Sequence, residues 1–457
     1  MIILSKPSNF PFYFINGKLP DEVIEELVKE LSYYVKNHEY LSGDWDGKVN
    51  LIQESKKGNL YFPIGLIEKV EAILMLNDIE YKTQEYFLDY KDYNFEWHGF
   101  DLRNYQLNAI SDLIKQKRES GSISLPTGAG KTLIALYWAM LNKTPFLVVV
   151  HRKELLYQWI DEIKENLNIN AGLVGDGKEN WGDVATVAMV QTLYQKIKKK
   201  QTLQVQYPLV IFDECHTIPA ETAYKVSMSL LPNLRLGLSA TPYREDNADL
   251  RIYGAIGLLT TTITPEQLVE EGYLARPRFF YLKTKPMQIN SDDFNTIYTK
   301  GITENEHRNN LIAQTANAFI LDNRSLYIHV DRIKHGLLLQ KIIPNSVFIS
   351  GSSKNRTEAI KLFSKGAISC LISTLLKEGV NIPSMDALIY ASGKKSAVAT
   401  IQTIGRALRP QVGKKDAIIV DIADCGNRLL LSHYRQRRDN YIKVFGKLAE
   451  EETKYAT

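Results

Sequence analysis

The chain has 457 residues, of which 44% are hydrophobic and 24% charged, a balance typical of a globular protein of about three domains. No stretch of about 18 apolar residues occurs and the first residues lack a signal-peptide pattern, which argues against the membrane and secreted classes and predicts a cytoplasmic location (the host cytoplasm, if the protein is viral). The three cysteines are far apart, which argues against a disulfide framework or a zinc site. Residues 1–95 hold 10 Lys and no Arg against 16 Asp and Glu, whereas the remainder has a basic excess that favours a polyanionic partner.

The first 92 residues have a different pattern of predicted helices and strands from the rest of the chain. This pattern predicts a small α+β accessory domain. A helical pattern over 23–36 is followed by the turn signal Trp45-Asp46-Gly47 and by two strand-like runs at 50–53 and 59–62. A hairpin loop over 54–58 joins these runs, and a second amphipathic helix is predicted over 66–76. Lys48, Lys56, Lys57 and Trp45 are candidates for contact with a nucleic acid, with a solvated loop over a core tryptophan as the alternative.

From about residue 93, short apolar strands alternate with longer helical patterns, which indicates parallel sheets joined by crossover helices. We expect an α/β protein with two parallel-sheet lobes, one over 93–258 and the other over 304–457, and an irregular connection over 259–303. The predicted strands are 122–125, 146–150, 184–189, 208–212 and 235–239 in the first lobe, and 326–330, 347–350, 369–372, 387–391 and 417–421 in the second. A helix over 434–447, carrying Arg435, Arg437 and Arg438, is expected near the C-terminus.

A phosphate-binding loop is predicted where the strand at 122–125 runs into a glycine turn and then a helix. The loop reads Pro126-Thr127-Gly128-Ala129-Gly130-Lys131-Thr132. Its glycines allow the backbone N–H groups to surround a phosphate, and the helix N-terminus adds partial positive charge. Lys131 is expected to reach the β- and γ-phosphates, and the hydroxyl of Thr132 to bind Mg²⁺. Leu125 occupies the position where the general motif has its first glycine.

Two further groups of residues indicate nucleotide hydrolysis. Asp213 and Glu214 follow the buried strand at 208–212, where Asp213 would hold Mg²⁺ and Glu214 would orient and deprotonate water. Arg406 and Arg409 are three residues apart on one face of a predicted helix, as expected of arginine fingers that stabilise charge on a transferring phosphoryl group. A surface salt-bridge helix is the alternative for the second group.

The motifs of the chain, taken in their order along the sequence, resemble those of the superfamily 2 helicases. The motors of these helicases have two RecA-like lobes of the P-loop NTPase fold. The resemblance covers roughly residues 100–425 and includes Gln106, the phosphate loop, Asp-Glu-Cys-His at 213–216, Ser-Ala-Thr at 239–241, the segment 374–379 and the segment 402–409. It implies that Gln106 recognises adenine with Arg103 beside it, and that Gly379 and Gln402 line the nucleotide cleft. It also implies that Ser239 and Thr241 couple hydrolysis to strand movement, with His216 as a polar contact between the lobes.

The same resemblance implies contacts with the nucleic-acid backbone, which carry affinity without reading sequence. The residues concerned are Arg152, Lys153, Gln191, Thr192, Arg244 and Thr374. Arg244-Glu245-Asp246 also resembles a motif of XPB-type motors, while Asn381 stands where many relatives have Asp.

The narrower resemblance is to the UvsW-type branch-migration helicases of bacteriophages, with RecG as a functional analogue. It implies an ATP- and Mg²⁺-dependent DNA helicase or translocase, monomeric, that unwinds or branch-migrates forked and junction DNA in recombination, repair and replication-fork processing. The alternatives are an RNA helicase, the motor subunit of a restriction complex, and an ATP-switched nucleic-acid-binding module.

Overall fold

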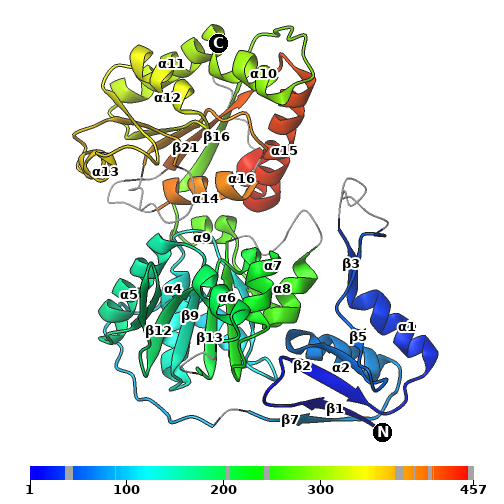
Figure 1. Cartoon of the computed structure of the whole chain (residues 1–457). Helices are drawn as coiled ribbons and strands as arrows, with labels where there is room; N and C mark the ends of the chain where they lie inside the picture. The colour runs from blue at the N-terminus through cyan, green and yellow to red at the C-terminus, as the bar shows by residue number, and fades with distance from the viewer. Residues whose placement is uncertain are drawn as a thin grey trace. The chain divides into compact units, whose positions relative to one another are not determined.

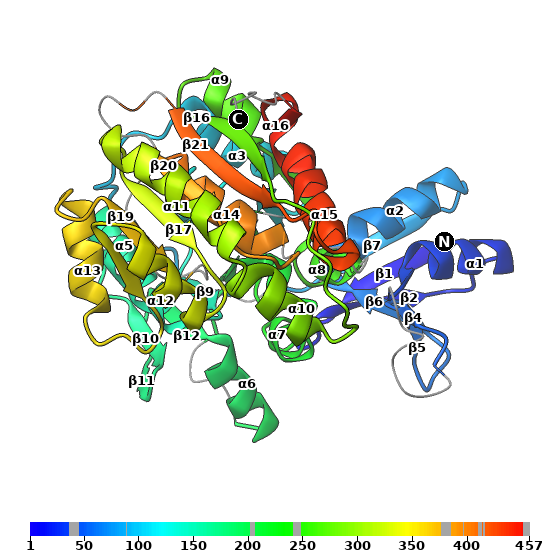
Figure 2. The ribbon, with the colours of Figure 1, turned by 90° about the horizontal axis from the view of Figure 1, so that it is seen from above.

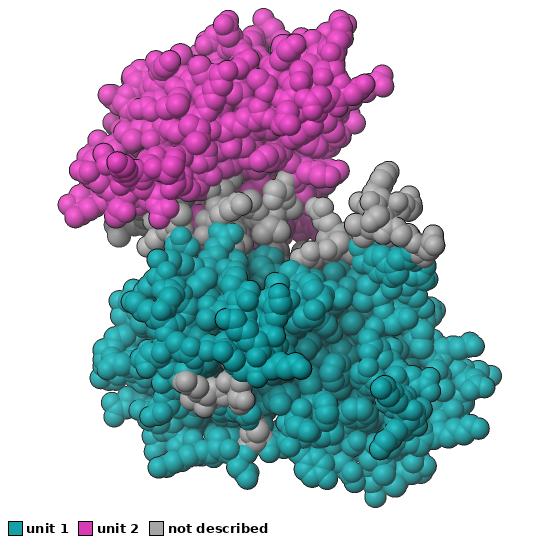
Figure 3. All heavy atoms as spheres, viewed as in Figure 1, with its two compact units in different colours: residues 1–125, 130–262 teal, residues 126–129, 263–457 magenta. Residues whose placement is uncertain are grey.

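The computed structural model describes residues 1–35, 45–87, 89–201, 206–240, 248–375, 385–395, 397–409, 414 and 416–450, without the side chains of 397–399, 402 and 403. The chain forms two compact units, residues 1–125 with 130–262 and residues 126–129 with 263–457 (Figures 1 and 3). Within the described part of the chain, no helix is long and apolar enough to cross a membrane.

A five-stranded sheet at the N-terminus has the order β5-β6-β2-β1-β7. Its strands are β1 (Ile2–Lys6), β2 (Phe12–Asn16), β5 (Gln53–Glu54), β6 (Leu60–Pro63) and β7 (Tyr81–Glu85). Strand β7 pairs in parallel with β1, and the other neighbours are antiparallel. Helices α1 (Asp21–Glu30) and α2 (Ile67–Leu76), the latter preceded by the 3₁₀ turn η2 (Ile64–Leu66), contribute to the apolar core of this sheet.

The predicted hairpin over 54–58 is confirmed, because β5 and β6 pair directly on either side of it. The helix predicted over 23–36 is wrong at its C-terminal end, because α1 stops at Glu30 and β3 (Ser32–Tyr34) begins. Strand β3 pairs with β4 (Lys48–Asn50), and tertiary pairing of this kind overrides a local helical pattern.

The first RecA-like lobe contains an eight-stranded sheet of order β11-β10-β12-β9-β13-β14-β8-β15, parallel except at the β10–β11 pair. Its strands are β8 (Gly121–Ser124), β9 (Phe146–Val150), β10 (Gly172–Gly175), β11 (Lys178–Asn180), β12 (Ala185–Met189), β13 (Leu209–Asp213), β14 (Leu234–Ser239) and β15 (Leu259–Thr262). Its helices are α3 (Asn104–Ile114), α4 (Lys131–Leu141), α5 (Lys153–Leu167), α6 (Val190–Lys198), η3 (Cys215–Thr217), α7 (Glu221–Ser227) and α8 (Asp249–Ile256). Strand β9 is buried throughout and β12 at every residue except Met189, as expected when both faces of a sheet are covered.

The second lobe contains a six-stranded parallel sheet of order β16-β21-β20-β17-β19-β18 (Figure 2). The strands are β16 (Arg276–Lys283), β17 (Leu326–His329), β18 (Ser346–Ile349), β19 (Cys370–Ser373), β20 (Ala387–Tyr390) and β21 (Asp416–Ala423). The helices are α9 (Pro265–Glu270), α10 (Phe294–Tyr298), the π-helical turn η4 (Thr299–Thr303), α11 (Glu306–Leu321), α12 (Ile333–Ile342), α13 (Arg356–Ser364), α14 (Ala397–Ala407), α15 (Arg428–Phe445) and α16 (Lys447–Glu450).

The stretch expected to be an irregular connection supplies an edge strand to each lobe. Strand β15 pairs with β8 in the first sheet, and β16 pairs with all eight residues of β21 in the second. Pro277 lies inside β16, and a proline, which has no backbone N–H, is tolerated in a sheet at an edge strand.

The N-terminal sheet packs against the first lobe within the same unit. Leu250 and Tyr253 of α8 contact its apolar core, and a Cβ on Gly65 would lie 2.0 Å from the carbonyl oxygen of Tyr253. Only glycine fits at residue 65, because backbone groups of α8 occupy the space of a side chain.

Candidate nucleotide and nucleic-acid sites

The phosphate loop joins the end of β8 to the start of α4. Gly128 and Gly130 have φ angles of +88° and +78°, which strain any other residue, and Gly130 caps α4. Thr127 and Ala129 lie in the loop, while Lys131 and Thr132 are the first two residues of α4. The backbone therefore takes the left-handed turns that aim N–H groups at an anion ahead of a helix N-terminus.

Gln106 lies beside this loop. A Cβ on Gly130 would come within 2.4 Å of Nε2 of Gln106, and Oε1 of Gln106 accepts the backbone N–H of Arg103 at 2.8 Å. The Gln106 side chain is almost fully buried and closes the N-terminal capping box of α3. Gln106, expected to recognise adenine, thus lies next to the loop that would hold the phosphates, and Arg103 is bonded to Gln106 through its backbone.

Lys131 pairs with the carboxylate of Glu214, with Nζ 3.3 Å from Oε1. Burial opposes the charge of Lys131, but Glu214 and Asp213 outweigh that effect and raise its pKa above the usual value. Burial also opposes the charge of Glu214 and would raise its pKa, but Lys131 and His216 lower this pKa to about 2. Burial and the charge of Glu214 raise the pKa of Asp213. A lysine, a glutamate and an aspartate therefore form one charged group at the ends of β8 and β13.

Glu214 has a strained backbone and an unsatisfied oxygen. Its φ of +49° lies in the left-handed region, which is uncommon for a residue other than glycine and clusters at functional sites. Among the residues that the structure describes, its buried Oε2 accepts no hydrogen bond, although Nδ1 of His216 is 3.3 Å away. The same His216 nitrogen is 3.1 Å from Oγ of Ser239, so these two predicted coupling residues are in contact.

Asp213 is held by its neighbours through both carboxylate oxygens. Oδ2 accepts the indole N–H of Trp159 at 2.8 Å, and Oδ1 accepts the backbone N–H of Glu214 at 2.9 Å. Trp159 lies on α5 and was not predicted from the sequence; its position on the buried face of an amphipathic helix is the signal that it packs near β13. A Thr132 hydroxyl and an Asp213 carboxylate are the hard oxygen ligands that Mg²⁺ prefers, so the donor chemistry fits this ion.

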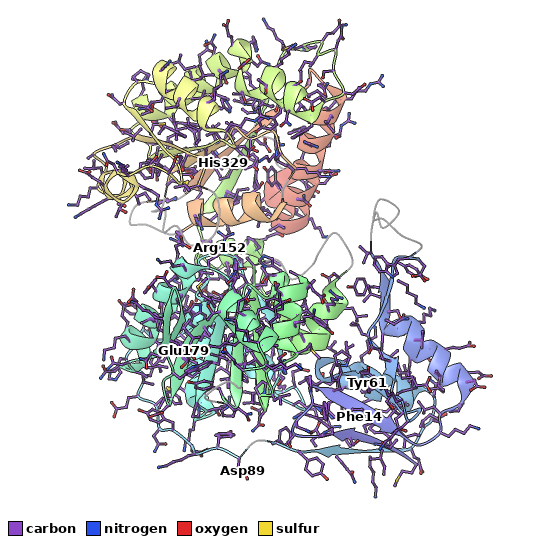
Figure 4. All side chains as sticks on the ribbon, viewed as in Figure 1. Phe14, Tyr61, Asp89, Arg152, Glu179 and His329 are labelled. Atoms are coloured by element: carbon purple, nitrogen blue, oxygen red, sulfur yellow. The ribbon has the colours of Figure 1, made fainter. Side chains whose placement is uncertain are left out.

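Four residues expected to contact a nucleic acid lie just after two neighbouring strands, β9 and β12. These strands pair in parallel, so their ends lie at the same edge of the sheet. Arg152 caps α5, Lys153 begins it, and Gln191 and Thr192 lie in the first turn of α6. The side chain of Gln191 donates from Nε2 to the carbonyl oxygen of His151 at 3.0 Å, which ties the two segments together. Figure 4 marks Arg152 in this part of the first lobe.

Lys153 is paired with an acidic residue that the sequence did not single out. Its Nζ lies 2.7 Å from Oδ2 of Asp176, which follows β10 and also accepts the hydroxyl of Tyr157 at 2.7 Å. The pair is solvent-exposed, with the Lys153 side chain 57% accessible. Because Asp176 comes from another strand of the sheet, sequence spacing could not reveal this partner.

In the second unit, residues 126–129 lie against α14. A Cβ on Gly405 would lie 2.8 Å from Cβ of Thr127, and a Cβ on Gly128 would lie 3.3 Å from Cγ of Arg409. Arg406, on the same helix, is buried. One predicted arginine finger thus lies beside the loop, while Thr374 follows β19 and donates its backbone N–H to Ile349.

The basic helix expected near the C-terminus needs a correction at Arg437. This side chain is fully buried and forms a bidentate ion pair with Asp421 of β21, NH2 to Oδ1 at 2.8 Å and Nε to Oδ2 at 2.9 Å. Arg437 thus anchors α15 to the sheet and is not a surface contact. Trp45 is 45% exposed, so the alternative of a core tryptophan is wrong.

Five residues singled out from the sequence lie wholly or partly outside the part of the chain that the structure describes. Thr241, Arg244 and Gly379 lie outside the described residues, and so does Asn381. Gln402 lies in α14, where its side chain is not described.

Two domain families match the chain. Residues 99–244 match the family described as "Type III restriction enzyme, res subunit", and residues 323–411 match the "Helicase conserved C-terminal domain". The chain therefore belongs to the superfamily 2 helicases, nucleotide-hydrolysing enzymes whose domains bind ATP. The expected fold of two RecA-like lobes with a small α+β domain is confirmed.

Similar proteins extend along most of the chain. A protein of Sulfolobus islandicus filamentous virus named as a helicase is 27% identical and covers 87% of this chain and 77% of its own. The ATP-dependent DNA helicase UvsW of phage T4 is 23% identical (86% and 85% covered), and the DNA 3′-5′ translocase XPB2 of Sulfurisphaera tokodaii is 26% identical (71% and 82%). Among solved structures, Dbp5 of S. cerevisiae bound to RNA shares the fold, with 16% identity, a TM-score of 0.52, and 75% and 87% of the chains covered.

Proposed function

We propose that this helicase is a DNA-stimulated ATPase that unwinds or branch-migrates forked and Holliday-junction DNA during recombination, repair and replication-fork processing. The observation that carries the ATPase assignment is the buried group of Lys131, Glu214 and Asp213 beside a glycine-capped helix N-terminus. DNA as the substrate is supported by the similarity to UvsW and XPB2, which are named as a DNA helicase and a DNA translocase.

ATP with Mg²⁺ would be held by the phosphate loop, with Gln106 and Arg103 at the base and Gly379 and Gln402 at the cleft. Thr132 and Asp213 would hold the metal, which shields phosphate charge when bound. Lys131 already faces a carboxylate, so a bound γ-phosphate would compete with Glu214 for this ammonium group. Release of Glu214 from Lys131 would then leave its carboxylate available as the general base for water.

We assign Arg406, on α14, and Arg409, two residues beyond its end, the stabilisation of charge on the transferring phosphoryl group. His216 and Ser239, joined by a hydrogen bond, would transmit the state of Glu214 to the Ser-Ala-Thr segment that includes Thr241. Such a link would couple the nucleotide to the nucleic-acid contacts through neighbouring hydrogen-bonded side chains.

The nucleic-acid backbone would be contacted by Arg152, Lys153, Gln191 and Thr192 of the first lobe, and by Arg244 and Thr374. These side chains recognise phosphates and therefore give no preference for a sequence. We propose that residues 1–92 form the accessory domain that adds structure preference, 93–258 and 304–457 the lobes, and 259–303 the connection. We further propose that the protein acts as a monomer in the cytoplasm, or in the host cytoplasm if it is viral.

Three alternatives remain testable. The first alternative is an RNA helicase, because the fold is similar to that of RNA-bound Dbp5. The second is the motor subunit of a restriction complex, because one matching domain family is that of a restriction-enzyme subunit. An ATP-switched binding module is the third. The test compares ATP turnover and strand displacement on forked DNA, Holliday junctions, blunt duplex and RNA. Strong stimulation with displacement on branched DNA supports the proposal, while stimulation by RNA alone, or ATPase without displacement, contradicts it.

A further inference from the structure

The two faces of the N-terminal sheet differ sharply in chemistry. Inward residues such as Leu4, Tyr13 and Phe62 join the core with α1 and α2. Alternation and register place the opposite set of side chains together on the other face, hereafter the outer face. The outer face comprises Ile3, Ser5, Phe12, Phe14, Asn16, Gln53, Tyr61, Pro63, Lys82 and Gln84.

Three aromatic rings lie side by side in the middle of this face. The Tyr61 ring centroid is 5.3 Å from that of Phe12 and 5.7 Å from that of Phe14. Figure 4 labels Phe14 and Tyr61 on this sheet. Phe10, 47% exposed, extends the row with its centroid 6.2 Å from Phe14. All three central rings are partly accessible, whereas aromatic side chains of the inner face, such as Tyr13 and Phe62, are buried.

Carboxylates are absent from the outer face, although residues 1–95 carry a net charge of −6. The two acidic residues of these fully described strands, Glu54 and Glu85, belong to the inner face, where Glu85 accepts hydrogen bonds from Tyr13 and Arg118. Glu80 precedes β7. The polar groups of the outer face are the hydroxyls of Ser5 and Tyr61, the amides of Asn16, Gln53 and Gln84, and the ammonium of Lys82. Such groups can form hydrogen bonds with the donors and acceptors on a base.

Lysines gather at one end of the same sheet. Register places Lys82 beside Ile3, which in turn pairs with Asn16. Lys56 and Lys57 are exposed in the hairpin that follows the Glu54–Leu60 pair, and Leu60 pairs with Ile15 at this same end. Lys18 follows two residues after β2. Positive charge next to an uncharged aromatic surface is complementary to a polyanion that carries flat apolar rings.

We propose that the outer face of the N-terminal sheet binds single-stranded DNA by stacking bases on Phe12, Phe14 and Tyr61. Single-strand-binding surfaces combine such rings with a basic track for the phosphates, and stacking tolerates any base. Lys82 and the Lys56–Lys57 hairpin would contact the phosphates. This inference rests on the proposed function, and it gives the accessory domain a role in holding an unpaired arm of a fork.

The test uses the full chain with Phe14→Leu and Tyr61→Leu together. Leucine keeps the residues apolar but removes the π face, which separates base stacking from the cross-strand packing that also stabilises a sheet. The matched control is Tyr86→Leu with Phe100→Leu, which removes two rings that are 61% and 86% exposed and lie outside the outer face. Thermal unfolding and basal ATP turnover of both variants should match the parent chain.

Binding is measured by fluorescence anisotropy on an oligothymidylate, a fork with single-stranded arms, and a blunt duplex. We expect the outer-face variant to bind the oligothymidylate about tenfold more weakly, since one stacked base contributes roughly that factor. Blunt-duplex binding should stay unchanged. Iodouracil-containing oligothymidylate should crosslink to peptides containing residues 12–14 or 61 in the parent chain.

Equal affinity of the variant and control for the oligothymidylate, or crosslinks confined to the lobes, would overturn the inference. A parent chain that neither binds nor is stimulated by any DNA would instead contradict the proposed function. An unchanged affinity for single strands with a loss of duplex binding would also overturn the inference, since it assigns the outer face to another form of DNA.

Discussion

The guanidinium of Arg118 grips the carboxylate of Glu71 with two parallel hydrogen bonds, NH2 to Oε1 at 2.9 Å and NH1 to Oε2 at 3.1 Å. Arg118 lies in the turn before β8 of the first lobe, while Glu71 lies on α2 of the accessory domain. Both side chains are largely buried, and Nε of Arg118 also reaches Glu85 of β7 at 2.5 Å. This pair, with the contact of Gly65 on α8, joins the accessory domain to the motor.

Arg118→Met should loosen that junction. Removing one partner of a buried ion pair leaves an uncompensated charge and costs about 3–5 kcal/mol. Limited proteolysis should cut between the accessory domain and α3 faster than in the parent chain. The control is Lys117→Met, which removes a 60%-exposed partner of the same Glu71 and should cost at most about 1 kcal/mol.

The stability difference between Arg118→Met and the parent chain should also depend on pH. Burial favours the neutral acid at Glu71, but Arg118 and Lys117 outweigh it and lower the pKa below the usual 4.5. A carboxylate whose pKa is lower in the folded state than in the unfolded state stabilises the fold at pH values above its unfolded-state pKa. This stabilisation is lost as the pH falls through the folded-state pKa. The difference measured by urea unfolding should therefore be full near neutral pH and shrink only below about pH 4.5. A difference that grows in acid would contradict this assignment.

Lys131→Ala should abolish ATP turnover, because the transferring phosphoryl group loses its fixed positive charge. It also leaves Glu214 without its ion-pair partner, so the pKa of Glu214 should rise. Steady-state ATPase with saturating DNA checks the first effect, and circular dichroism checks folding. A folded variant with near-parental turnover would refute the phosphate-loop assignment.

Glu214→Gln should separate nucleotide binding from chemistry. Lys131, Thr132 and Asp213 remain, so ATP and Mg²⁺ should still bind, whereas hydrolysis should fall by about a hundredfold or more because water loses its base. Nucleotide affinity from a fluorescent ATP analogue and single-turnover hydrolysis are the two measurements. Trapping of ATP-bound protein on DNA is expected, and a collapse of affinity with normal turnover per bound ATP would show that the roles are wrong.

The sequence predicted ten strands of the two RecA-like sheets well because these strands are nearly continuous apolar runs, whereas β10, β11, β15 and β16 were not predicted. The strand at 146–150 was predicted with its observed bounds, and others differ by a residue or two. The N-terminal sheet was largely missed, because β1 pairs with β7 about 80 residues away and such pairing leaves no local signal. Within the site, motif spacing placed Lys131 and Glu214 together, but the ion pair of Lys153 with Asp176 joins separate strands and could not be deduced.

Asp176→Asn should tighten binding to DNA. The change releases Lys153 from its carboxylate partner and removes a negative charge beside the proposed phosphate contacts of α5 and α6. Affinity should rise several-fold at low salt, and the slope of log affinity against log salt should steepen by about 0.7–0.9 per added phosphate contact. Asp161→Asn, on the exposed side of α5, is the control and should leave the slope unchanged. An unaltered slope in Asp176→Asn would mean that Lys153 does not contact phosphate.

The role of the accessory domain in choosing branched DNA is better tested by surface changes than by deletion. Removing residues 1–90 would uncover Leu250 and Tyr253 of α8, which pack on the core of the N-terminal sheet, so a loss of activity could reflect misfolding. Lys56→Ala with Lys57→Ala changes only an exposed hairpin. With saturating single-stranded DNA, we expect the ATPase rate to stay near the parental level, because the motor lobes are untouched. Holliday-junction migration and fork regression should slow several-fold, since two phosphate contacts that position the branch are lost.

The control variant is Lys29→Ala with Lys91→Ala. These two exposed lysines lie away from that hairpin, so the change removes the same charge and should leave migration unchanged. Equal migration by the hairpin variant and this control would show that the hairpin does not engage the branch.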